Sequence, residues 1–207
     1  MARKQGARST GYDARRASLI AAMHARLVAR DQSPPSMREL AAAAGVTMPT
    51  LRHYFGKRDD VIIAVLEAIG QAGAVHLAEA AMSELPFAES IDVALRHGLA
   101  GLRQGLAEVH MLGLREAMGQ QRVGPAYLYA ILEPSLQAME ARLAAHQARG
   151  EMRQGDARHA ALALLAPLVL AGLHQAELGG DELRPLDLDA LVADHAAAFV
   201  RGYAARA

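Results

Sequence analysis

An all-α fold of about nine helices is predicted by three features of this sequence. Alanine and leucine dominate the composition, and both residues favour helices. Aromatic residues make up only 4% of the chain, and β-branched residues are also scarce, whereas strands are rich in both kinds. Apolar residues recur at spacings of three and four in several segments, and no segment alternates as a strand would.

The composition excludes several classes of protein. With 207 residues, 52% of them hydrophobic, the chain can bury a substantial core, so a mainly disordered chain is excluded. It has no cysteine, which excludes disulfides and cysteine-ligated metals. No apolar stretch follows the charges of residues 1–8, as a secretory signal would require. The longest nearly apolar run, residues 160–173, is too short to span a bilayer and is expected to form a buried core helix. We therefore expect a soluble, cytoplasmic protein without a membrane partner.

Charge is distributed unevenly along the chain, although the formal net charge is zero. Residues 1–58 contain eleven Lys and Arg but three Asp and Glu, a net charge of +8, and residues 59–207 carry the compensating −8. A basic head on an acidic body indicates that the head meets a polyanion and the body does not.

Local signals divide the basic head into short helices. A first helix is expected at about residues 13–30, where four apolar residues recur at helical spacing, and prolines 34 and 35 end the pattern. Ser36 and Glu39 have the spacing of a capping box, which starts a second helix that ends at Gly45. Thr47 is the expected N-cap of a third helix at residues 48–55.

Five further helices are expected in the acidic body, beyond a fourth that starts near Lys57. Asp59 and Asp60 favour the N-terminal dipole of that fourth helix. Proline and glycine predict breaks at Pro86 and at residues 119–125, 150–155 and 179–185.

Residues 37–56 predict a helix-turn-helix. Two helices joined by so tight a turn must cross closely, which requires a small residue on the first helix, Ala41, and a glycine in the turn, Gly45. Apolar residues must hold the pair against the first helix, and Leu40, Val46, Leu51 and Phe55 can do so. Such a rigid pair can present one helix to the major groove of DNA.

Here the sequence resembles the tetracycline-repressor-like (TetR) family of transcriptional regulators, from about Leu19 to Leu66. The strongest parts are SMRELA at 36–41, GVT at 45–47, PTL at 49–51, YFG at 54–56 and RDDV at 58–61. The resemblance implies a DNA-binding domain at residues 1–58, with an arm at 1–11 and the helix-turn-helix at about 37–56. It implies a ligand-binding and dimerisation domain at residues 59–207.

Several residues of the head are implied to contact double-stranded DNA. By resemblance, residues 47–50 meet base edges and phosphate, Arg58 holds a phosphate, and the arm follows the backbone or enters the minor groove. The implied DNA-contacting residues are Arg3, Lys4, Arg38, Thr47, Met48, Pro49, Thr50, Arg52, His53, Tyr54 and Arg58. Thr47 and Pro49 are better explained as a cap and a turn-former. The order Arg52-His53-Tyr54 departs from the family, which often has tyrosine at the first of these positions.

The body is implied to form a homodimer and to bind a small-molecule effector. Residues expected at the dimer interface lie on the last two long helices: Leu162, Leu165, Ala166, Val169, Leu173, Leu191, His195, Phe199 and Tyr203. Residues expected to line the effector pocket lie on the middle helices: Met82, His97, Leu102, Arg103, His110, Met111, Arg115, Met118, Tyr127 and Tyr129. The two arginines of that set could meet an anionic group.

The combined prediction is a ligand-responsive regulator that binds a palindromic operator and is released by its effector. A repressor is expected, and an activator is the alternative, since the fold does not set the sign of regulation. One alternative is a helical carrier or scaffold without DNA binding. Another is a helical enzyme, but the sequence has no Walker loop, no nucleophile elbow and no His-Glu-x-x-His pair. We expect no catalytic residue, cofactor or metal.

Overall fold

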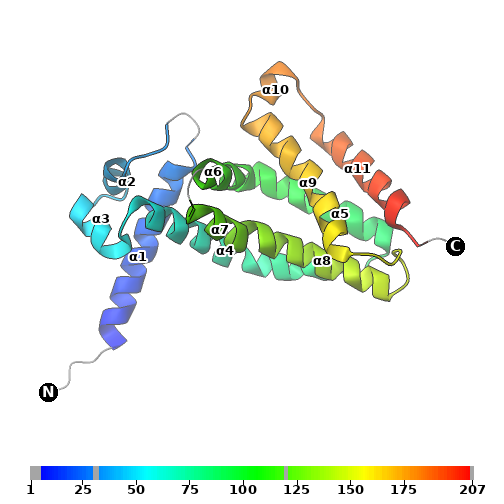
Figure 1. Cartoon of the computed structure of the whole chain (residues 1–207), viewed down its shortest axis with the longest axis horizontal. Helices are drawn as coiled ribbons and strands as arrows, with labels where there is room; N and C mark the ends of the chain where they lie inside the picture. The colour runs from blue at the N-terminus through cyan, green and yellow to red at the C-terminus, as the bar shows by residue number, and fades with distance from the viewer. Residues whose placement is uncertain (1–5, 30–32, 119–120, 206–207) are drawn as a thin grey trace. The chain divides into compact units, whose positions relative to one another are not determined.

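Helices account for nearly all of the regular structure in the computed structural model, which describes residues 6–29, 33–118 and 121–205 (Figure 1). In chain order they are α1 (Gly6–Leu27), α2 (Met37–Ala43), α3 (Met48–Phe55), α4 (Arg58–Ala81), α5 (Phe87–Gly101), the π-helical η1 (Leu102–Leu106), α6 (Ala107–Ala117), α7 (Val123–Tyr127), the π-helical η2 (Leu128–Leu132), α8 (Glu133–Ala148), α9 (Ala157–Ala176), α10 (Gly180–Leu183) and α11 (Leu188–Tyr203). Among the described residues, extended pairing is limited to one bridge between Met152 and Ala204. The predicted all-α class is confirmed.

The expected boundaries of α2 and α3 are confirmed, whereas α1 differs from its prediction. It begins at Gly6 rather than near Asp13 and ends at Leu27 rather than Arg30. Residues 7–10 include good helix formers and no proline, so nothing stops the helix from extending backwards. Half of the segment that we expected to be an arm is therefore helical.

A kink in the middle of the chain was not expected. Gly105 has φ 114°, a backbone conformation that L-residues with side chains rarely adopt, and it bends the chain between α5 and α6 within η1. The predicted break at residues 119–125 is confirmed, since α6 ends at Ala117 and α7 begins at Val123. Pro125 itself lies in the first turn of α7, where its missing N–H has no intrahelical partner.

The chain folds as two compact units, which divide it differently from the expected boundary at residue 58. Unit 1 comprises residues 1–69 and 112–127, and unit 2 comprises residues 70–111 and 128–207. Residue 58 is the first residue of the continuous helix α4, so the first half of α4 stays with the helix-turn-helix. The end of α6 and the whole of α7 also belong to unit 1.

In unit 1, a Schellman turn links α2 to α3. The N–H of Val46 donates to the carbonyl of Ala41, and the N–H of Gly45 donates to that of Ala42, both at 3.0 Å. Gly45 has φ 65° at the left-handed position that this motif requires. The predicted small residue at the crossing, Ala41, is buried, as are Leu40 and Leu51 on either side of the turn.

In unit 2, α5, α8, α9 and α11 surround one apolar core. Its largest side chains include Phe87, Ile91, Leu95, Leu143, Leu164 and Phe199. Helices approach closely at glycines, since a Cβ at Gly98 would lie 2.6 Å from Leu168. Two of the described helices, α4 and α9, are long and apolar enough to cross a membrane, a test that core helices of soluble proteins also pass.

A polar network is buried at one end of the unit 2 core. The guanidinium of Arg142 donates to the Ser90 hydroxyl (2.8 Å) and to the carbonyls of Ala80 and Met82. The fully buried imidazole of His146 lies between the same hydroxyl (Nε2, 2.8 Å) and the Glu151 carboxylate (Nδ1, 2.6 Å). Burial lowers the pKa of His146. The network ties together α4, α5 and α8 with satisfied polar groups, as a buried position requires.

Replacing Gly45 by Ala should destabilise the protein by about 1 kcal/mol, because alanine is strained in the left-handed conformation. No atom lies within 4 Å of the added Cβ, so the cost comes from the backbone alone. The matched control is Gly11→Ala in α1, which also meets no atom and should stabilise by about 0.5–1 kcal/mol. Urea unfolding measures both changes, and equal effects would contradict the assigned turn.

Stability should fall as the pH is lowered from about 6.5 to about 4, because burial lowers the pKa of His110 to about 4. An unfolded chain takes up this proton near pH 6.5, so acid favours unfolding across that window. The expected loss is about 2 kcal/mol at pH 5. Urea unfolding at several pH values should give a flatter profile for His110→Phe. His97→Gln, which removes an exposed imidazole, is the control, and an unchanged profile in His110→Phe would contradict the assignment.

Candidate nucleic-acid interface

Helix α3, the second helix of the helix-turn-helix, is fixed at its N-terminal end by its own cap. The Thr47 hydroxyl accepts the N–H of Thr50 at 3.3 Å and lies 2.9 Å from the Thr50 hydroxyl. Pro49 occupies the first turn. Thr47 and Pro49 therefore have the local structural roles that the sequence favours, and the Thr50 hydroxyl is already paired with a neighbour on the same turn.

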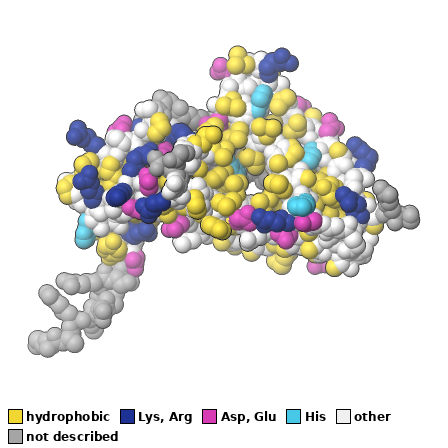
Figure 2. Space-filling view, in the orientation of Figure 1, with side chains coloured by type: hydrophobic (Ala, Val, Ile, Leu, Met, Phe, Trp, Pro, Cys, Tyr) yellow, Lys and Arg dark blue, Asp and Glu magenta, His cyan; other side chains and the backbone are white. Residues whose placement is uncertain are grey.

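Side chains that could meet DNA lie on the outer faces of α2 and α3. Arg38, Pro49, Arg52 and His53 are exposed, whereas Met48, Thr50 and Tyr54 are half-buried. Leu51 is fully buried and points to the other side of the helix. Figure 2 shows several Lys and Arg side chains on the surface of this end of the chain. The arm residues Arg3 and Lys4 lie outside the described residues.

The α2 side of this surface is stabilised by the predicted capping box. The Ser36 N–H donates to the Glu39 carboxylate (2.7 Å), and the Glu39 N–H donates to the Ser36 hydroxyl (3.3 Å). Both bonds lower the pKa of Glu39, which also pairs with Arg26 of α1 at 3.3 Å. The carboxylate of Glu39 therefore fixes the start of α2 and its contact with α1.

Arg58 is placed differently from the other residues of the set. Its guanidinium makes two hydrogen bonds to the buried Glu116 carboxylate of α6, at 2.7 and 2.9 Å, and its Nε donates to the carbonyl of Pro35. These bonds to Glu116 raise the pKa of Arg58. The expected phosphate contact would require a guanidinium that already has three acceptors within the protein. In this structure Arg58 instead links α4 and α6.

Sequence reasoning missed two contacts between α1 and α3. The rings of Tyr12 and Tyr54 are stacked, with centroids 4.8 Å apart, and the guanidinium of Arg16 lies over the ring of Phe55 at 5.1 Å. The spacing of four residues between Tyr12 and Arg16 could have indicated that they share a face of α1. The partner helix could not be read from that spacing.

The residues expected to line an effector pocket divide between the two units. Arg115, Met118 and Tyr127 belong to unit 1, and the other seven belong to unit 2. Met82, His97, Arg103, Met118 and Tyr129 are exposed, Met111 and Arg115 are half-buried, and Leu102, His110 and Tyr127 are buried. Arg103 is paired with Asp189 at 2.8 Å, and Arg115 donates to the carbonyl of Leu27.

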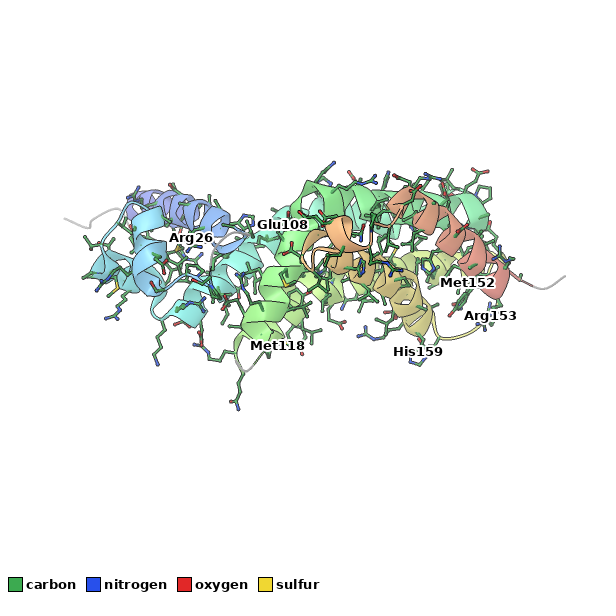
Figure 3. All side chains as sticks on the ribbon, turned by 90° about the horizontal axis from the view of Figure 1, so that it is seen from above. Arg26, Glu108, Met118, Met152, Arg153 and His159 are labelled. Atoms are coloured by element: carbon green, nitrogen blue, oxygen red, sulfur yellow. The ribbon has the colours of Figure 1, made fainter. Side chains whose placement is uncertain are left out.

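A cavity of about 210 Å³ lies elsewhere in unit 2, beside the loop between α8 and α9. Met152, Arg153 and His159 line it (Figure 3), together with Gln147 of α8 and Tyr203 of α11. None of the ten expected pocket residues is among its lining. Among the residues that the structure describes, no group of three or more His, Asp or Glu could hold a metal ion.

The residues expected at the dimer interface divide between an exposed face and the core. Leu162 and Ala166 are exposed on α9, in a stripe with Ala163, Pro167 and Leu170 that the sequence analysis did not single out. Figure 2 shows hydrophobic side chains along the face of α9 in this view. The expected buried core helix therefore has only one buried side.

The remaining expected interface residues face inward to different degrees. Phe199 is buried in the unit 2 core beside Phe87, and Tyr203 stacks on it at 4.3 Å. His195 is half-buried, with its Nε2 2.9 Å from the carbonyl oxygen of Leu164. Leu165, Val169, Leu173 and Leu191 are also half-buried. The outer face of α11 carries exposed small residues, Ala190, Ala193, Ala197 and Ala198, together with the exposed charged residues Asp194 and Arg201.

No family model matches the sequence, and no curated protein sequence matches it. Solved structures do match along most of the chain. A protein assigned to the TetR family of transcriptional regulators from Mesorhizobium loti has a TM-score of 0.78 at 18% identity, over 93% of this chain and 98% of its own. FadR from Bacillus subtilis, solved with stearoyl-CoA, has a TM-score of 0.71 at 19% identity. The match covers 89% of this chain and 97% of the FadR chain.

A third solved structure is SmeT, the repressor of the Stenotrophomonas maltophilia multidrug efflux pump SmeDEF. Its TM-score is 0.62 at 20% identity, over 93% of this chain and 90% of its own. TM-scores of 0.62 to 0.78 establish the fold. Over about nine-tenths of its length, the chain has the fold of the TetR-family transcriptional regulators.

Proposed function

We propose that this protein is a ligand-responsive transcriptional repressor that binds palindromic operator DNA as a homodimer. The observation that supports this most directly is the outer face of the α2–α3 pair. Arg38, Arg52 and His53 are exposed there on two helices whose crossing is fixed by the Schellman turn. An α-helix fits the major groove, and arginine can donate to guanine edges or to phosphates.

The charge distribution supports the same surface. The +8 charge of residues 1–58 would neutralise backbone phosphates, while the −8 charge of the remainder would repel the duplex. Association would therefore be steered by the basic end of the chain. It would also weaken steeply as salt concentration rises, because bound phosphates release condensed counterions.

Dimerisation through α9 and α11 is supported by the exposed apolar and small residues of these helices. Leu162 and Leu170 are 54% and 66% exposed, and the residues exposed between them on the same face of α9 are also apolar. A continuous exposed apolar stripe of this kind is typical of an interface. Small side chains allow helices to approach closely, as a four-helix bundle between two copies would require. Two copies would present two α3 helices to successive major grooves.

Effector control is supported by the course of α6. Its first residues, up to Met111, belong to unit 2, and the remainder, from Leu112, belongs to unit 1. In unit 1, Glu116 holds Arg58 at the start of α4, and Arg115 holds the end of α1 at Leu27. A ligand that changes α6 would thus act on the helices that carry α3, and would shift the population away from the DNA-binding form. FadR with stearoyl-CoA and SmeT with triclosan are ligand complexes of this fold.

Removal of either exposed arginine should weaken DNA binding. Arg38→Ala or Arg52→Ala should lower affinity for a random-sequence duplex about tenfold, about 1.4 kcal/mol, and should lower the slope of log affinity against log salt by about 1. Fluorescence anisotropy at several salt concentrations measures both. The control is Arg96→Ala, which removes an exposed arginine from α5 with the same change in net charge. Equal weakening by the control would contradict a localised interface.

A charge on the exposed stripe of α9 should separate the proposed dimer. Leu170→Glu should shift the protein from dimer to monomer in sedimentation velocity, since the carboxylate would be buried without a partner in the assembled bundle. The side chain is exposed within one chain, so the helical content should not change. Val75→Glu, which alters an exposed apolar side chain of α4, should remain dimeric. A wild-type monomer at micromolar concentration, or a dimeric Leu170→Glu variant, would contradict this interface.

A further inference from the structure

Tyr54, near the end of α3, is held by aromatic neighbours at the surface of unit 1. Its ring stacks on Tyr12 of α1 with an interplanar angle of 17°, and it contacts His53 edge-on at 5.7 Å. It also lies 6.3 Å from the ring of Phe55. Tyr12 keeps 41% of its surface exposed, so this stack lies at the edge of the protein and not in its core.

A second contact lies one turn further along α1. Arg16 places its guanidinium over the ring of Phe55, and residues four apart share one face of a helix. Tyr12 and Arg16 therefore contact two consecutive aromatic residues of α3, Tyr54 and Phe55. These two contacts matter because α3 has only eight residues, of which Leu51 alone is fully buried. A helix this short depends on tertiary contacts for its order.

We propose that Tyr12 is a positioning residue of the DNA interface, which holds the ring of Tyr54 in one orientation before DNA binds. This inference rests on the proposed function of the α2–α3 surface. Without a neighbour, the half-exposed Tyr54 side chain would sample several rotamers, and binding would have to immobilise it at a cost in entropy. Because stacking on Tyr12 already immobilises the Tyr54 ring in the free protein, DNA binding does not lose that entropy again. The hydroxyl of Tyr12 is not required for this role, because the stack is formed by the ring.

The structural part of the proposal is tested without DNA. In spectra of protein labelled with ¹³C-tyrosine, Tyr54 ring protons should show a ring-current shift that is lost in Tyr12→Ala and kept in Tyr12→Phe. Circular dichroism should match wild type in both variants. The melting temperature should match it in Tyr12→Phe and fall by only a few degrees in Tyr12→Ala, because the stack is lost but Tyr12 lies outside the buried core. Unchanged Tyr54 resonances in Tyr12→Ala would overturn the stack.

The functional part is tested with the duplex that the wild-type protein selects from a random-sequence pool. Tyr12→Ala should bind it about two- to tenfold more weakly, which corresponds to the usual size of an aromatic pair, with an unchanged salt slope. Tyr12→Phe should bind as wild type does. The double variant Tyr12→Ala/Tyr54→Ala should bind no more weakly than Tyr54→Ala alone, because Tyr12 acts through Tyr54.

Three results would overturn the positioning role. If the double variant lost affinity by the product of the two single losses, the two tyrosines would act independently. Weak binding by Tyr12→Phe would make the Tyr12 hydroxyl a direct contact. Unchanged affinity in Tyr12→Ala would leave the stack without a role in binding, while the wild type still binds DNA. If the wild type retains no duplex at low salt, the proposed function fails and takes this inference with it.

Discussion

The crossing of α2 and α3 is the constraint on which the rest of the structure depends. Two backbone hydrogen bonds across Gly45 reverse the chain within a few residues, and the small side chain of Ala41 lets the helices meet. Once the crossing of α2 and α3 is fixed, Leu51 faces the core, and Arg52 and His53 face solvent. Tyr12 and Arg16 of α1 then hold the far end of α3. The arrangement of the proposed DNA-binding surface is thus a consequence of packing.

A second, smaller set of contacts joins the helices of unit 1 on which the proposed effector response would depend. The Arg58–Glu116 pair has good geometry and a carboxylate that is nearly fully buried. Removing one member of such a pair leaves an uncompensated buried charge, so the contact between α4 and α6 depends on both side chains. Asp60 and Arg122, 2.6 Å apart, add an exposed link between α4 and the residues that follow α6. In the proposed mechanism, a ligand that moves α6 would act on these contacts.

Sequence reasoning succeeded where the signal is local and failed where it depends on distant partners. The capping box of Ser36, the cap at Thr47 and the glycine at position 45 each act within a few residues, so α2 and α3 were predicted correctly. The partner of Arg58 lies 58 residues away, and no spacing rule could identify Glu116. Similarly, α9 is apolar on nearly all sides, so its sequence does not distinguish the side that faces the core from the stripe of Leu162 and Leu170 that faces out. The kink at Gly105 was missed because helices tolerate many glycines in their ordinary conformation.

The most direct test of the account is selection of duplexes from a random-sequence pool by the purified full-length protein at low ionic strength. Two α3 helices on a symmetric dimer should enrich an inverted repeat whose half-sites are centred about one helical turn apart, roughly 34–36 Å. Five base pairs inserted between the half-sites should abolish the preference, because the second half-site would then face away from the dimer. Recovery of unrelated sequences, or indifference to that insertion, would contradict the central claim that α3 reads the major groove in pairs.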